Sequence, residues 1–98
     1  MRRKNTQSIS DILKEVFEEN PLLQRKLAET RLLAAWPEIL GKSVAQYTNT
    51  LYISKEVLYV SLSSAVLRTE LSLCREMLIE KLNKSAGLKV ISNIVFTA

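Results

Sequence analysis

The stretch TLYISKEVLYVSL, which spans Thr50–Leu62, decides the fold because it predicts a β-hairpin. The residues on both sides of Lys55-Glu56 alternate in polarity and are rich in β-branched and aromatic side chains, as strands are. The turn itself is chemically unfavourable, since neither residue is the Gly, Asn or Asp that two-residue hairpin turns prefer. We still predict a two-residue turn here, because both flanks are so regular.

A two-residue turn fixes which residues of the two strands face each other. The expected opposed pairs are Ser54 with Val57, Ile53 with Leu58, Tyr52 with Tyr59, and Leu51 with Val60. Because side chains alternate between the two faces of a strand, one face of this hairpin should be apolar. That face holds Leu51, Ile53, Leu58, Val60 and Leu62. The opposite face should carry the Tyr52–Tyr59 pair, together with Ser54 and Ser61.

A first helix is predicted well before the hairpin, within residues 8–20. Ser8 and Asp11 have the spacing of a capping box, and the apolar residues that follow recur at helical intervals. The helix should end at Asn20, because the residue before a proline is disfavoured in the α conformation.

A second helix is expected from about Leu22 to Ala35, where Pro37 stops or restarts it. We expect its inward residues to be Leu23, Leu27 and Ala34, and its outward residues to be Arg25, Lys26 and Glu29. Gly41 should supply a bend, and residues 42–47 should form a further short helical piece.

A third, long helix is predicted after the hairpin, from near Ser64 to about Lys84, with Gly87 as its stop signal. Its apolar stripe consists of Leu67, Leu71, Cys74, Leu78 and Leu82. Residues 88–96 then predict a final strand. A connection of this length is typical of a right-handed crossover, which would place the last strand parallel to the second. We therefore expect an α+β two-layer sandwich with a mixed three-stranded sheet, helices on one face and the tyrosine face open or covered by a partner.

Composition restricts the chemistry sharply. The 98 residues suffice for one domain, which we place at residues 8–98 after a basic flexible arm of residues 1–7. There is no histidine, and the single cysteine, Cys74, permits neither an internal disulfide nor a thiolate metal cage. The two isolated glycines form no phosphate-binding loop. We therefore expect no enzyme, no metal and no cofactor, and the lack of a long apolar run or secretory signal favours the cytoplasm.

The spaced residues around the only tryptophan resemble the signature of the bacterial DciA family, long known as a domain of unknown function. The resemblance rests on Trp36, Ile39-Leu40-Gly41, Val44-Ala45, Thr48, the run Leu51–Leu71 with Glu70-Leu71, Leu78, Leu82-Asn83 and Ile94-x-Phe96. It covers about residues 8–96 and implies a short single-domain member with a K-homology-like fold. DciA proteins resemble helicase loaders in role, since they associate with the replicative helicase and with DNA, and they are not enzymes. The chain lacks the G-x-x-G loop with which true K-homology domains clamp a nucleic-acid backbone, so that binding mode is not carried over.

Function must then be sought on surfaces. Tyr52 and Tyr59 are the candidates for stacking on single-stranded bases, although a cross-strand pair that only stabilises the hairpin would look the same. The candidate phosphate contacts are Arg2, Arg3, Lys4, Arg68 and Arg75, for which the alternative is an ordinary solvated surface. The net charge of +4 favours a polyanionic partner.

We expect a non-enzymatic accessory protein of DNA replication that binds single- or double-stranded DNA and the replicative helicase. One alternative is a protein-interaction domain, in which the face of Tyr52 and Tyr59 forms a homodimer and nucleic acid is irrelevant. Another is a K-homology-like RNA-binding protein.

Overall fold

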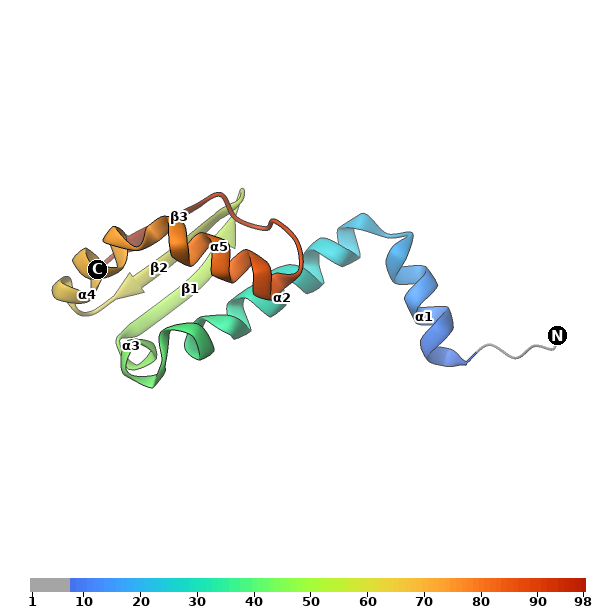
Figure 1. The fold of residues 1–98 in the computed structure, drawn as a ribbon, viewed down its shortest axis with the longest axis horizontal. Coiled ribbons are helices and arrows are strands. Elements are labelled where there is room, and N and C mark those ends of the chain that lie inside the picture. Colours follow the sequence, from blue (N-terminus) through green and yellow to red (C-terminus); the bar gives the residue numbers. More distant parts are fainter. Residues whose placement is uncertain (1–7) are drawn as a thin grey trace.

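The computed structural model describes residues 8–98, which fold into a helical layer over one face of a sheet, with an N-terminal helix projecting to one side (Figure 1). The described elements, in chain order, are α1 (Ile9–Glu18), α2 (Pro21–Leu40), α3 (Lys42–Gln46), β1 (Thr48–Ser54), β2 (Val57–Leu62), α4 (Ala65–Leu73), α5 (Arg75–Ala86) and β3 (Asn93–Thr97). The predicted α+β two-layer class is confirmed.

The sheet has the predicted mixed topology, in the order β1-β2-β3. β1 and β2 are antiparallel, and β3 is parallel to β2 after the crossover through α4 and α5. All four predicted cross-strand pairs of the hairpin are present, including Tyr52 opposite Tyr59.

The turn is made by Lys55 and Glu56, which both adopt left-handed backbone angles, with φ of 50° and 65°. Two ordinary side chains thus occupy positions where hairpins favour Asn and Gly.

The predicted inward face of α2 is wrong. Leu23, Leu27 and Ala34 are exposed, whereas the buried residues of this helix are Ala28, Leu32, Ala35 and Trp36. The reason is that the beginning of α2 extends beyond the sheet (Figure 1). From Ala28 onward the helix has a core to pack against, and this part sets the inward face.

α2 is also longer than predicted, because it continues through Pro37 to Leu40. Proline removes one backbone N–H from a helix interior and usually bends or ends the helix. Here the residues on both sides of Pro37 are held by packing, since Trp36 is buried and Ile39 contacts the core. The helix ends instead at Gly41, whose φ of 89° lies in the positive range that glycine adopts most readily, as the predicted bend requires.

The predicted long helix after the hairpin is two helices, α4 and α5, which are separated at Cys74. At this residue the backbone leaves helical geometry, with φ −104° and ψ 14°. Two residues earlier, the Ser72 hydroxyl donates a hydrogen bond to the carbonyl oxygen of Arg68 at 2.7 Å, a pattern that bends helices. The break does not change which face is apolar, because Leu71 before it and Leu78 after it are both buried.

Trp36 anchors the corner between α2 and β1. Its side chain is only 1% exposed, and its indole Nε1 donates a hydrogen bond to the Thr48 hydroxyl at 3.1 Å. That hydroxyl donates in turn to the carbonyl oxygen of Val44, also at 3.1 Å. A buried indole N–H needs such a partner. The corner that contains Gly41 is therefore fixed by a hydrogen-bond chain as well as by packing.

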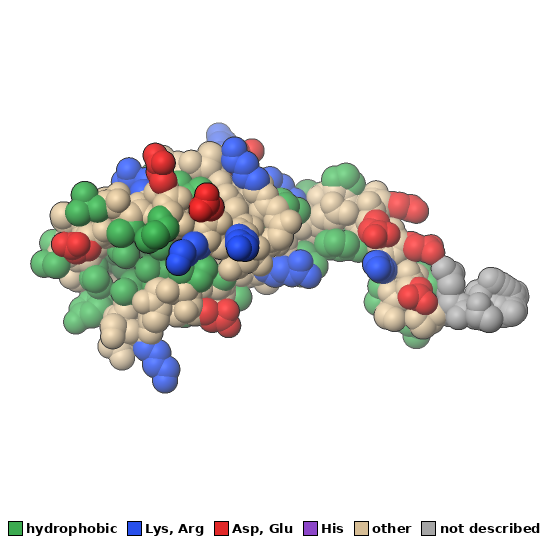
Figure 2. Space-filling model, in the orientation of Figure 1, with side chains coloured by type: hydrophobic (Ala, Val, Ile, Leu, Met, Phe, Trp, Pro, Cys, Tyr) green, Lys and Arg blue, Asp and Glu red, His purple; other side chains and the backbone are tan. Residues whose placement is uncertain are grey.

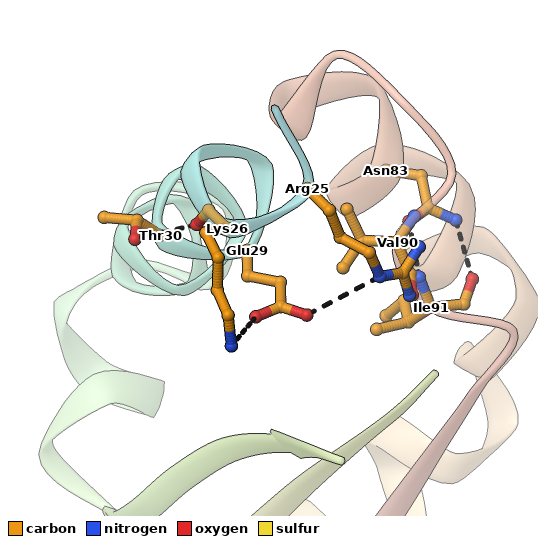
Figure 3. Close-up of polar contacts among 7 residues, drawn as sticks. All are labelled: Arg25, Lys26, Glu29, Thr30, Asn83, Val90 and Ile91. Atoms are coloured by element: carbon orange, nitrogen blue, oxygen red, sulfur yellow. Dashed lines mark hydrogen bonds and ion pairs between the residues drawn. The ribbon is translucent and has the colours of Figure 1, made fainter. Parts of the chain in front are cut away.

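The final strand is shorter than predicted, since β3 begins only at Asn93. The segment before it is held by side chains rather than by a strand ladder (Figure 3). The Asn83 amide donates to the carbonyl oxygen of Ile91 at 2.9 Å and accepts from the backbone N–H groups of Val90 and Ile91 at 2.9 and 3.0 Å. Arg25 donates to the carbonyl oxygen of Val90 at 2.9 Å and lies 3.7 Å from a carboxylate oxygen of Glu29. Together α2 and α5 fix where β3 enters the sheet.

Candidate binding face of the sheet

The sheet face opposite the helices carries the stacked pair of Tyr52 and Tyr59. Their ring centroids are 4.9 Å apart and the ring planes differ by 13°, so the two rings lie nearly parallel. Tyr52 is 53% exposed and Tyr59 is half-buried. The next residues along both strands, Ile53 and Leu58, point to the other face, where they join the core. The alternation predicted from the sequence thus places both tyrosines on the uncovered side.

The third strand adds to this face a residue that the sequence reasoning missed. The parallel register places Val95 beside Tyr59, which extends the row from Tyr52 across all three strands. The alternation of the last strand could have predicted this position of Val95, because its neighbours Ile94 and Phe96 both face the core. Beside this row, two residues along β1 and β2 from the tyrosines, the hydroxyls of Thr50 and Ser61 lie 2.7 Å apart.

The face is aromatic and hydroxyl-rich rather than charged, since β1, β2 and β3 contain no charged residue. The nearest cation in the sequence is Lys55, which is exposed in the hairpin turn. On the side of the molecule that Figure 2 shows, Lys and Arg side chains are spread among Asp and Glu rather than collected in one patch.

The structure does not bring the predicted phosphate-binding residues together with the tyrosines. Arg68 is half-buried and donates a hydrogen bond to the carbonyl oxygen of Leu62, at the end of β2. Arg75 lies at the start of α5, where its Nε is enclosed and has no hydrogen-bond partner among the described residues. The remaining predicted cations, Arg2, Arg3 and Lys4, lie outside the described residues. Tyr52 and Tyr59 are therefore the predicted site residues that the fold places in contact.

Residues 8–98 show neither a grouped set of metal ligands nor a membrane-spanning helix. In this part of the chain, no three His, Cys, Asp or Glu side chains are grouped as a metal site would require. None of the helices in it has the length and apolar character needed to cross a bilayer.

The helical layer, the mixed sheet and the uncovered aromatic row define a small α+β domain with one open face. The sequence of residues 8–96 matches the family described as "Dna[CI] antecedent, DciA", and the chain belongs to that family. No curated protein and no solved structure matched the chain. The family has a role in loading the replicative helicase during DNA replication.

The structure explains several residues on which the family resemblance rests. Trp36 and Thr48 belong to the hydrogen-bond chain that fixes the corner before β1, and Asn83 holds the segment before β3. Leu71 is buried, whereas its neighbour Glu70 is exposed. The signature thus describes mostly how the domain is built, and contact with other molecules must be assigned from its exposed surface.

Proposed function

We propose that this protein is a non-enzymatic accessory protein of DNA replication that binds single-stranded nucleic acid on its open sheet face and associates with the replicative helicase. The observation that carries the proposal is the exposed, stacked Tyr52–Tyr59 pair in a chain of the DciA family. Residues 8–98 act as one domain in this proposal, and the site of action is the bacterial cytoplasm, where replication takes place.

The chemistry of the face suits bases better than phosphates. Aromatic rings stack on any base, because every base has a π-face, and each stacked base contributes about 1–3 kcal/mol. A cross-strand aromatic pair contributes only about 0.2–1 kcal/mol to the stability of its hairpin. More than half of the Tyr52 side chain is open to solvent, so one ring of the pair offers a free face beside the hydroxyls of Thr50 and Ser61.

Phosphate contacts in this proposal come from cations outside the strands. Lys55 lies in the hairpin turn, three residues after Tyr52, and Arg2, Arg3, Lys4, Arg68 and Arg75 remain the candidates from the sequence. The chain as a whole carries a net charge of +4. If several of these cations contact phosphates, the affinity for single-stranded DNA falls by about 0.7 log units per contact for each tenfold rise in salt.

The test compares two exposed tyrosines. Tyr52→Ser should weaken binding of a fluorescent single-stranded oligonucleotide by about tenfold or more in an anisotropy titration, because a stacked base is lost. Tyr47→Ser is the matched control, since Tyr47 is 47% exposed but lies at the end of α3 rather than on the sheet face. Equal affinities of Tyr52→Ser and the unmodified protein at both a low and a high salt concentration would contradict the proposal.

The helicase part of the proposal needs its own experiment. A pull-down against the replicative helicase of the same bacterium should retain the unmodified chain. If the chain bound neither the helicase nor the oligonucleotide, the proposed role in replication would be contradicted. Competition between DNA and RNA oligonucleotides of the same sequence then separates a DNA-binding protein from the K-homology-like RNA-binding alternative.

A homodimer formed through the tyrosine face is the other alternative. This alternative predicts that the protein is a dimer, which Tyr59→Asp dissociates. It also predicts that the protein has no affinity for the oligonucleotide.

A further inference from the structure

α1 is an amphipathic helix that contributes no buried residue to the domain. Its apolar side chains and those at the start of α2 are instead exposed, and they make up seven of the exposed large hydrophobic residues of the described chain. They are Ile9, Ile12, Leu13, Val16, Leu22, Leu23 and Leu27. Figure 2 shows hydrophobic side chains exposed along this projecting part of the molecule. Single exposed apolar residues are ordinary, but a contiguous set of this kind marks an interaction surface.

An apolar groove of about 400 Å³ runs between α1 and α2. It is lined by Ser10, Leu13, Lys14, Val16, Phe17, Leu23, Leu27 and Arg31. The charged residues of this lining, Lys14 and Arg31, are both cationic. The ion pairs of the described part of the chain join Arg25 and Lys26 to Glu29, so neither cation of the groove takes part in them.

The helix that forms one wall of this groove is itself acidic. α1 contains Asp11, Glu15 and Glu18 against Lys14, so its net charge is −2, and Glu19 follows directly. The first half of α2, residues 21–31, contains three cations and one anion, which gives +2. An acidic amphipathic helix is therefore complementary, in both hydrophobicity and charge, to the cationic groove that the same chain presents.

We propose that two copies of the chain associate through this surface, with α1 of each copy lying in the groove between α1 and α2 of the other. A twofold arrangement forms both contacts at once, because the same surface is used by both partners. A standard interface buries about 800 Å² per partner. Seven large aliphatic side chains, each between 36% and 77% exposed, provide apolar surface of that order. This interface is separate from the tyrosine face, which stays open in the dimer.

Sedimentation velocity over a range of concentrations, without nucleic acid, tests the interface. The unmodified chain should be a concentration-dependent dimer. Leu13→Asp should raise the dimer dissociation constant by about tenfold or more, because it buries an unpaired carboxylate in the interface. Val66→Asp is the matched control, since Val66 is 71% exposed on α4 and should leave the dimer intact.

A charge exchange tests the arrangement itself. Arg31→Glu changes the charge of the groove lining from +2 to 0 and places an anion beside Lys14, and Glu18→Lys with Glu19→Lys makes the end of α1 basic without removing its capping box. Each variant alone should be weakened as a dimer, because like charges then meet in both contacts. An equal mixture of the two variants should associate again, since the new anion in one groove then meets the new cations at the end of the other copy's α1, and the unchanged groove meets the unchanged acidic helix.

A monomer at every concentration would overturn the inference, as would a mixture of charge variants that fails to associate. A dimer that Val66→Asp or Tyr52→Ser dissociates as strongly as Leu13→Asp would place the interface elsewhere and overturn it too. Since no helicase or oligonucleotide is present, these outcomes are independent of the anisotropy and pull-down experiments, and either proposal can fail alone.

Discussion

Single polar side chains decide where the irregular parts of this domain lie. Asn83 satisfies three backbone groups of the segment that leads into β3, and the Thr48 hydroxyl both accepts from Trp36 and donates to Val44. Buried backbone N–H groups that lose their partner cost far more than an average hydrogen bond contributes. The segment of Val90 and Ile91 is buried without a strand ladder, so its position depends on one amide.

Asn83→Ala should therefore lower the free energy of unfolding by about 2–3 kcal/mol, since it removes three hydrogen bonds and leaves the N–H groups of two buried residues unpaired. The measurement is urea unfolding followed by circular dichroism. Ser85→Ala, two residues further along α5 at an exposed position, is the control and should change stability by less than about 0.5 kcal/mol. Similar losses for both variants would show that the amide is not what holds this segment.

At the scale of elements, the hairpin turn contains the clearest local strain. Lys55 and Glu56 both have positive φ, a conformation that costs a side-chain-bearing residue about 1–2 kcal/mol. Lys55→Asn combined with Glu56→Gly should raise the free energy of unfolding by about 1–2 kcal/mol, because these residue types favour such a turn. Ser54→Gly, one position earlier in β1, should instead lower it, since glycine weakens a strand. A double variant less stable than the unmodified chain would contradict this account of the turn.

The same elements show which features a single sequence predicts. The hairpin register and the exposed tyrosine pair were predictable, because a period of two and a turn length fix every partner along two strands. The face of α2 was not, since leucines occur on several sides of this helix and only the position of the sheet decides which of them are buried. The break at Cys74 was not predictable either, because the apolar spacing of the stripe continues across it from Leu71 to Leu78. Arg68 bonds to the carbonyl oxygen of Leu62 at the end of β2, a contact that the spacing of residues along the helix does not predict.

On the scale of the whole molecule, the core and the N-terminal helix are nearly separate. The buried cluster is made by α2 from Ala28 onward, the sheet, α4, α5 and the segment before β3, while α1 adds none of its members. Its links to α2 include the half-buried Phe17 and two hydrogen bonds from the Gln24 amide to carbonyl oxygens near the end of α1. An amphipathic sequence pattern is the same whether a helix packs on its own chain or on another. The sequence therefore predicted α1 as a helix but not that its apolar face is uncovered.

This separation predicts the effect of removing α1. A chain that begins at Asn20, and so keeps the cap of α2, should unfold with a free energy within about 1 kcal/mol of the full chain, because no core side chain is lost. The urea dependence of that free energy should fall only slightly, since it follows the surface exposed on unfolding and α1 buries little. Ending the chain at Ser92 is the contrasting truncation, because it removes the buried Ile94 and the third strand, and that chain should not fold. If removing α1 instead cost several kcal/mol in dilute solution, the helix would be stabilising its own domain, and its apolar face would not be available to a second copy.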